Sequence, residues 1–246
     1  MTLARSRLLA ALLPLLLACS CSDELSDSSR WSDLDAASGD SHTGIPAQPF
    51  GEEHKGEATY YAATGAGNCS FPASPNDLLV AAMNASDYAN SQLCGACVRV
   101  SGPKGSVDLR IVDQCPECKS GDLDLSPMAF GKIAELSAGR VPMSWIAIPC
   151  PISDPLVYHF KDGANPWWFA IQVRNHRYPI ARLEVESSGV WVNVERQNYN
   201  FFVKNGGFGP GPFRVRVTDV LGQSIEDNSI PLLDNADFIG STQFPP

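Results

Sequence analysis

The chain has 246 residues, of which 44% are apolar and 18% are charged. This composition allows one large or two small folded domains and excludes a globally disordered chain. The 20 glycines and 19 prolines favour short strands and turns over long helices. The formal net charge of -9 at pH 7 argues against a nucleic-acid partner or a polybasic membrane-surface protein, because both depend on cationic side chains.

Residues 1–20 have the pattern of an export signal. Arg5 and Arg7 precede an apolar run over residues 8–18 that is too short to span a bilayer. The run ends at Ala18-Cys19, which resembles a bacterial lipoprotein processing site with Cys19 as the lipidated residue. We therefore expect a secreted, extracellular protein, or alternatively a lipoprotein anchored to the cell envelope.

An acidic segment rich in Ser and Asp occupies residues 21–53. It carries eight Asp and Glu residues against the single Arg30, so it holds most of the net charge. Such a segment cannot bury enough apolar surface to offset the entropy lost on ordering, and we predict a flexible linker. The remaining chain is close to neutral, with 15 Lys and Arg against 19 Asp and Glu.

Six cysteines lie between residues 69 and 150. In an exported protein this number suggests three disulfides, for which the sequence alone allows 15 pairings. The two C-x-x-C units, residues 94–97 and 115–118, also have the spacing of a zinc site, but an oxidising compartment favours disulfides. Because no cysteine follows Cys150, we place a domain boundary at residues 151–155.

The first domain, residues 54–151, is predicted to be small, rich in β-structure and barrel-like. Short apolar or alternating stretches predict strands at residues 97–100, 107–112 and 144–148. One helix is expected over residues 78–83, after Pro75-Asn76-Asp77. A second is expected from Ser126 as N-cap, with Pro127 in its first turn, to about Gly139.

The second domain, residues 155–246, is predicted to be nearly all β. Residues alternate with period two in four stretches, at residues 170–174, 182–186, 190–194 and 213–217. Turns rich in Ser, Asn and Gly separate them at residues 187–189 and 205–207. This spacing favours an immunoglobulin-like β-sandwich, so the fold class expected for the whole chain is mainly β.

Carboxylates concentrate between residues 113 and 124. Asp124 lies between two leucines immediately before a predicted helix, where desolvation would raise its pKa toward that of a general acid. The alternative is that Asp124 only hydrogen-bonds the start of the helix. Asp113 ends an alternating strand and could face the same groove, whereas we interpret Asp122 as a solvated turn residue.

Two sets of motifs in the right order are similar to those of expansins, especially bacterial and fungal expansin-like proteins. The first domain carries Gly56-Glu-Ala-Thr59-Tyr60-Tyr61, Cys94-Gly-Ala-Cys97, Val112-Asp113 and Leu123-Asp124-Leu-Ser-Pro-Met-Ala-Phe130. The second carries Trp167-Trp168-Phe-Ala-Ile-Gln-Val-Arg-Asn-His176 and Val215-Arg-Val-Thr-Asp219. The resemblance covers about residues 54–246.

This resemblance implies a six-stranded double-psi β-barrel related to family 45 glycoside hydrolases, followed by a β-sandwich of the family 63 carbohydrate-binding modules. It implies loosening of plant cell walls without appreciable hydrolysis. Thr59, Asp113 and Asp124 would be the polar groove residues, with Asp124 at the position of the general acid of the hydrolases. A tyrosine of some bacterial members is replaced here by Cys115, so its role is not carried over.

The family's disulfide pairing would join Cys69 to Cys94 and Cys97 to Cys150, and Cys115 would then pair with Cys118. The residues themselves also argue against hydrolysis, because an inverting glycosidase needs a separate base. In the related hydrolases this base follows the motif occupied here by Thr59, and residues 59–75 contain no Asp or Glu. Glu57 keeps weak cleavage open.

Aromatic residues of the second domain are candidates for glycan binding. Trp167, Trp168 and Tyr199 are expected to form a platform that stacks on glucose rings, with Lys161 beside it and Tyr60 contributing from the first domain. The preceding Asn-Pro favours a turn that exposes both tryptophans, whereas core packing is the alternative. Trp191 alternates with valines in a strand, and we assign it to structure.

The sequence thus predicts a cellulose-binding protein that weakens contacts between glucan chains. A weak endoglucanase, a peptidoglycan lytic transglycosylase and a non-catalytic cellulose-binding adhesin are the alternatives. The expected partners are cellulose and other neutral wall glucans, with xyloglucan or peptidoglycan as further candidates. No nucleic acid, protein partner, metal or cofactor is implied, and a monomer is expected.

Overall fold

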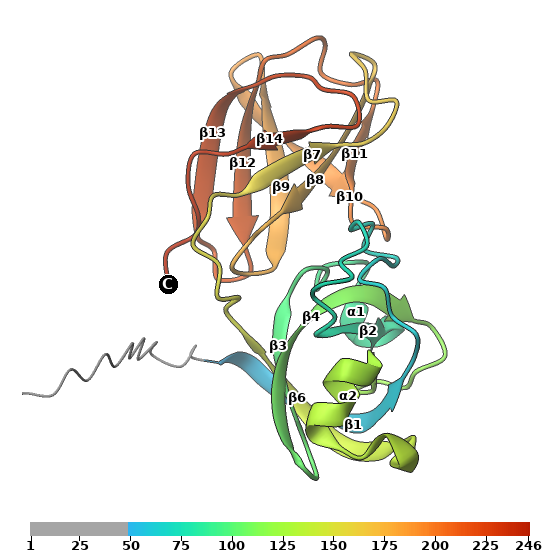
Figure 1. Cartoon of the computed structure of the whole chain (residues 1–246). Helices are drawn as coiled ribbons and strands as arrows, with labels where there is room; N and C mark the ends of the chain where they lie inside the picture. The colour runs from blue at the N-terminus through green and yellow to red at the C-terminus, as the bar shows by residue number, and fades with distance from the viewer. Residues whose placement is uncertain (1–48) are drawn as a thin grey trace, which may run out of the picture. The chain divides into compact units, whose positions relative to one another are not determined.

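The computed structural model describes residues 49–246, which form a closed β-barrel followed by an eight-stranded β-structure (Figure 1). The expected export signal, Cys19 and nearly all of the acidic segment lie outside the described residues. Within the part that is described, no helix has the length and apolar character needed to cross a membrane. The predominance of strands confirms the expected mainly β fold class.

Six strands close the barrel in the order β1-β5-β2-β4-β3-β6. They are β1 (Phe50–Tyr60), β2 (Val80–Asn84), β3 (Cys97–Gly102), β4 (Gly105–Cys115), β5 (Leu123–Leu125) and β6 (Val141–Ile148). The pairs β1/β5 and β2/β4 are parallel, and the other pairs are antiparallel. Because β1 begins at Phe50, the barrel starts within the segment that we had expected to be linker.

Three short helices accompany the barrel: α1 (Ala85–Tyr88), α2 (Pro127–Ile133) and the 3₁₀ turn η1 (Leu136–Ala138). The hydroxyl of Ser126 accepts the N–H of Ala129 at 3.1 Å and caps α2, as the sequence predicts, but α2 ends at Ile133 and not near Gly139. The helix expected over residues 78–83 is wrong. Every residue of β2 is buried, and a short apolar run without alternation does not distinguish a buried strand from a buried helix.

The second domain folds into a β-sandwich. Its strands are β7 (Val157–Phe160), β8 (Trp168–Arg174), β9 (Ile180–Ser187), β10 (Val190–Arg196), β11 (Phe202–Asn205), β12 (Phe213–Asp219), β13 (Ser224–Ile230) and β14 (Asp237–Ile239). They are hydrogen-bonded in the order β13-β12-β9-β10-β11-β8-β7-β14. Phe169 on β8 nevertheless meets Phe213 on β12 with ring centroids 5.1 Å apart, so the sheet folds over itself around an apolar core.

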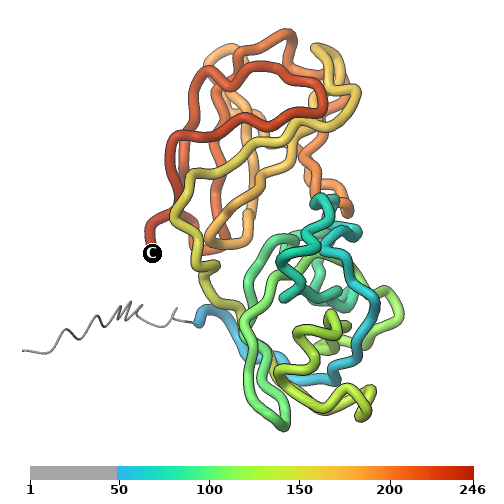
Figure 2. Tube along the Cα trace, viewed as in Figure 1, coloured from blue at the N-terminus to red at the C-terminus, as the bar shows by residue number. Residues whose placement is uncertain are grey.

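Three disulfides tie the barrel together, joining Cys69 to Cys94, Cys97 to Cys150 and Cys115 to Cys118. These are the pairs that the resemblance implies. Cys150 lies just after β6, and its backbone N–H also donates to the carbonyl of Arg177 in the sandwich at 2.9 Å. Figure 2 shows the chain passing from this point into the second domain.

Candidate functional site

The three polar groove residues named from the sequence lie in one row across the barrel. Thr59 on β1 pairs with Asp124 on β5, Asp124 pairs with Ala82 on β2, and Ala82 pairs with Asp113 on β4. Side chains of residues paired on neighbouring strands point to the same face. Two strand spacings place the Cα atoms of Asp113 and Asp124 roughly 10 Å apart.

Asp124 is a half-buried carboxyl group with a specific hydrogen-bond donor. The hydroxyl of Thr59 donates to its Oδ1 at 2.6 Å. Burial raises the pKa of Asp124 and the negative charge of Glu117 raises it further, while the Thr59 hydroxyl and the charge of Arg140 oppose the shift. A raised pKa is the property that a carboxyl group needs in order to donate a proton to an oxygen atom of a bound glycan.

Asp113 is held by backbone donors. Its Oδ1 accepts the N–H of Asn68 at 2.6 Å and that of Gln114 at 2.8 Å. Burial, Asp113 and Asp124 together raise the pKa of the Tyr61 phenol, so both carboxylates act on the same hydroxyl group. The sequence had identified Tyr61 only as part of a motif.

A groove of about 590 Å³ surrounds Asp124 and contains three further carboxylates. Asp122 is only 7% exposed, and it accepts the N–H of Glu57 at 2.8 Å and that of Lys119 at 3.2 Å. The prediction that Asp122 is a solvated turn residue is therefore wrong. Its side chain is buried and hydrogen-bonds the start of β5 to β1. Glu57 itself forms an ion pair with Arg140 at 2.8 Å.

Two more groove residues come from different elements. Tyr60 is 39% exposed, and its ring packs beside that of Phe130 with centroids 4.9 Å apart. Glu117 lies on the loop that the Cys115–Cys118 disulfide closes, and it lines the same groove as Asp124. Sequence reasoning gave Glu117 no role, although its place inside a C-x-x-C unit could have signalled a constrained position.

The aromatic residues of the sandwich are arranged by a tight turn. Asn165 and Trp168 exchange two backbone hydrogen bonds of 3.0 Å, so Pro166 and Trp167 occupy the turn. The side chain of Asn165 also accepts the N–H of Trp167 at 3.0 Å. Trp167 is consequently 75% exposed at the tip, while Trp168 is half-buried at the start of β8.

Trp168 and Tyr199 line one surface depression of about 470 Å³, whereas Trp167 is not part of its lining. Lys161 is half-buried, and its Nζ lies 5.2 Å from the centroid of the Phe201 ring. Phe201 in turn lies 6.0 Å from Tyr199. The structure therefore brings Trp168, Tyr199 and Lys161 into one neighbourhood.

Trp191 differs from these residues because charged side chains cover its ring. The guanidinium groups of Arg214 and Arg216 lie 5.1 and 4.4 Å from the ring centroid. Arg216 is itself held by Glu184 at 2.8 Å. These cation–π contacts engage the ring of Trp191 with charged groups of its own domain.

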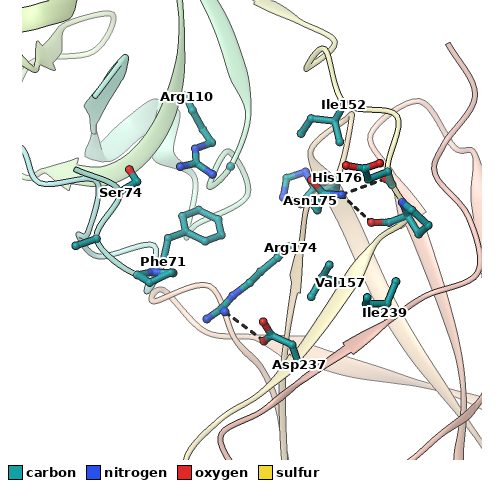
Figure 3. A pocket seen from close by; sticks show the side chains of 15 residues that line it. Phe71, Ser74, Arg110, Ile152, Val157, Arg174, Asn175, His176, Asp237 and Ile239 are labelled. Atoms are coloured by element: carbon teal, nitrogen blue, oxygen red, sulfur yellow. Dashed lines mark hydrogen bonds and ion pairs between the residues drawn. The ribbon is translucent and has the colours of Figure 1, made fainter. Parts of the chain in front are cut away.

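A third cavity, of about 680 Å³, lies where the barrel and the sandwich meet (Figure 3). Phe71 and Arg110 line it from the barrel, and Arg174, His176 and Asp237 line it from the sandwich. It shares no lining residue with the groove around Asp124 or with the depression beside Trp168. Among residues 49–246, no group of three or more His, Cys, Asp or Glu side chains is arranged to hold a metal ion.

Comparison with known proteins supports the resemblance seen in the sequence. A family model described as lytic transglycolase matches residues 54–145. The Expansin-YoaJ protein of Bacillus subtilis is 38% identical over 192 residues, which cover 75% of this chain and 81% of that protein.

Two solved structures of the expansin from Clavibacter michiganensis resemble the whole described region. The apo crystal structure is 32% identical, with a TM-score of 0.74, and the match covers 79% of this chain and 99% of that one. A variant in complex with cellohexaose is 30% identical, with a TM-score of 0.75 and the same coverage. This chain therefore belongs to the expansin family.

Proposed function

We propose that this protein is a secreted, monomeric wall-loosening protein that binds cellulose and other neutral glucans and weakens their lateral contacts without hydrolysing them. The observation that carries the proposal is the state of the carboxylates around Asp124. Burial raises the pKa of Asp124, which suits a proton donor. The neighbouring carboxylates of Asp122 and Glu57 are bound to backbone N–H groups and to Arg140, respectively.

Hydrolysis with inversion needs a carboxylate that is free to activate water opposite the acid. Asp113 lies in the same row, but its Oδ1 accepts two backbone N–H groups, from Asn68 on the loop after β1 and from the adjacent Gln114. A carboxyl group with a raised pKa, next to Asp122 and Glu57 carboxylates that are already held by other groups, favours hydrogen bonding to a glucan and competition with its neighbouring chains. This geometry supports displacement of chains rather than cleavage.

The sandwich supplies the attachment in this proposal. Flat indole and phenol rings cover the C–H faces of glucose while the sugar hydroxyl groups remain hydrogen-bonded at the ring edge. Such stacking needs accessible rings. Trp167 is strongly exposed, and Trp168 and Tyr199 line one surface depression. The cellohexaose complex of the Clavibacter expansin supports a β-glucan as the ligand.

Glycan cleavage is the second candidate, and two observations favour it. The barrel matches the lytic transglycolase family over residues 54–145, and the pKa of Asp124 is raised. A lytic reaction on peptidoglycan could proceed with a single acid if a substrate hydroxyl group acts as the nucleophile. Incubation with cellulose, xyloglucan and peptidoglycan, with assays of soluble sugar and of mechanical weakening, distinguishes the two. Steady product release would contradict the proposed function, and binding without weakening would indicate an adhesin.

The change Asp124→Asn is expected to reduce the weakening of cellulose paper or wall strips to the background level. The amide keeps the shape of the side chain and can still accept from Thr59, but it has no proton of comparable acidity to donate. Cellulose retention should stay within about twofold, because the platform residues are untouched. Creep of loaded wall strips and a pull-down with microcrystalline cellulose measure the two quantities.

The matched control for this prediction is Asp108→Asn. Asp108 is an exposed carboxylate on the same barrel, paired with Arg99 at 2.7 Å and outside the groove lining. This variant should loosen walls as the wild type does. Undiminished creep with Asp124→Asn would show that the groove carboxyl group is dispensable.

A further inference from the structure

The loop between β10 and β11, residues 197–201, is hydrogen-bonded to the barrel at several points. The hydroxyl of Ser91 donates to the carbonyl of Gln197 at 2.8 Å, and the amide of Asn90 donates to the carbonyl of Arg196 at 3.3 Å. Figure 2 shows this loop meeting the loops that follow β1 and β2. The same loop carries Tyr199 of the proposed platform.

Asn68 connects this loop to Asp113, the end of the polar row on the barrel. Its side-chain amide donates to the carbonyl of Asn198 at 2.8 Å and to the hydroxyl of Tyr88 at 2.9 Å. Tyr88 in turn donates to the same carbonyl of Asn198 at 3.1 Å. Burial raises the pKa of Tyr88 to about 12, so its hydroxyl group remains a donor at neutral pH. The side chain of Asn68 is thus held directly and through a buried phenol.

The backbone N–H of Asn68 contacts a different partner, in the row of polar residues on the barrel. Its N–H donates to Oδ1 of Asp113 at 2.6 Å. The preceding residue, Gly67, lies so close that an added Cβ would stand 2.4 Å from Cγ of Asp113. The backbone of this loop therefore packs directly against the Asp113 carboxylate. This close packing is possible because Gly67 has no side chain.

We infer that Asn68 is a positioning residue through which the sandwich loop sets the orientation of the Asp113 carboxylate. The inference rests on the proposed function and deepens it. The side-chain amide of Asn68 donates to the carbonyl of Asn198, and its backbone N–H donates to the carboxylate of Asp113. The loop that carries Tyr199 and the carboxylate of Asp113 are then coupled, because Tyr199 directly follows the carbonyl that accepts from Asn68.

Replacement of Asn68 by alanine tests this link. Asn68→Ala keeps the backbone N–H but removes the side-chain contacts to Asn198 of the sandwich loop, to Tyr88 and to Gln114. We expect amide exchange at residue 68 to accelerate about tenfold, because its hydrogen bond to Asp113 is no longer held in place. Wall weakening should fall by about tenfold or more, since small misplacements of a site residue have large effects. Cellulose retention should change little.

The matched control is Asn90→Ala. Asn90 donates to the same part of the sandwich chain, at the carbonyl of Arg196, but has no contact with Asp113. It should leave both the exchange at residue 68 and the weakening close to wild type. Equal behaviour of the two variants would overturn the inference, because the loss would then belong to the interface in general.

A second variant, Gly67→Ala, disturbs Asp113 while leaving the side-chain amide of Asn68 intact. Its Cβ must displace either the carboxylate or the loop, so weakening should fall with retention preserved. Unchanged weakening with Gly67→Ala would also contradict the inference. If the wild type weakens no wall, the proposed function fails, and the exchange rates at residue 68 in the three variants still decide whether Asn68 couples the two sites.

Discussion

Simultaneous replacement of Trp167, Trp168 and Tyr199 by alanine is expected to abolish retention on cellulose. One aromatic face that covers a glucose ring removes roughly 80 Å² of apolar surface from water, which contributes about 2 kcal/mol. Three such contacts correspond to a loss of about ten-thousand-fold in affinity. A depletion assay on microcrystalline cellulose measures it, and Trp167→Ala is expected to have the largest single effect because Trp167 is 75% exposed.

Trp191→Ala is the control for this prediction. Its ring lies beneath Arg214 and Arg216, so its loss should lower the free energy of unfolding and leave cellulose retention unchanged. The triple variant, by contrast, should keep the wild-type thermal transition within a few degrees. A collapsed transition in the triple variant would show that the three residues hold the sandwich together. Retention that survives in a folded triple variant would exclude them as the platform.

Acidification is expected to destabilise the protein through His176, the second large effect. His176 is 3% exposed, and burial lowers its pKa to about 4, with the charges of Arg196 and Arg110 adding to the shift. The unfolded chain takes up this proton near pH 6.5, whereas the folded protein does so only near pH 4. The contribution is therefore complete above pH 6.5 and falls by about 3 kcal/mol as the pH drops to 4.

Urea unfolding at pH 7.5, 5.5 and 4 measures this decline. His176→Gln should flatten the profile between pH 6.5 and 4, because glutamine does not titrate, although it also lowers stability at neutral pH. His54→Gln is the comparison, since His54 stacks on Trp145 in the barrel and leaves His176 in place. An unchanged slope in His176→Gln would mean that other groups cause the acid sensitivity.

The sequence predicts most of the fold because its strongest signals are local. Alternation finds β4, β8, β9, β10 and β12, and the Ser126-Pro127 pair marks the start of α2. The prediction of a helix for the apolar run at residues 78–83 is wrong. The run follows Pro75-Asn76-Asp77, a typical helix start, but such a run fits a buried strand equally well. It forms strand β2 because it is buried in the barrel between β4 and β5, which come later in the chain.

The candidate site is predictable only in part, for the same reason. Asp124 between two leucines indicates a desolvated carboxyl group, and the family resemblance groups it with Thr59 and Asp113. Their arrangement in one row is seen only in the strand order of the structure. The burial of Asp122 and the role of Asn68 do not follow from local patterns. They depend on hydrogen bonds to residues 65 positions earlier and 130 positions later in the chain.

The bonding of Cys150 has a consequence for protein engineering. Its side chain is fixed to Cys97 of the barrel, and its backbone N–H is fixed to the carbonyl of Arg177 in the sandwich. A chimera that exchanges the second domain for an unrelated module at this point would therefore lose more than a binding surface. To keep the barrel as it is, the donor module must present a carbonyl acceptor to residue 150 and another to Asn68, which favours donors from the same family over generic cellulose-binding tags.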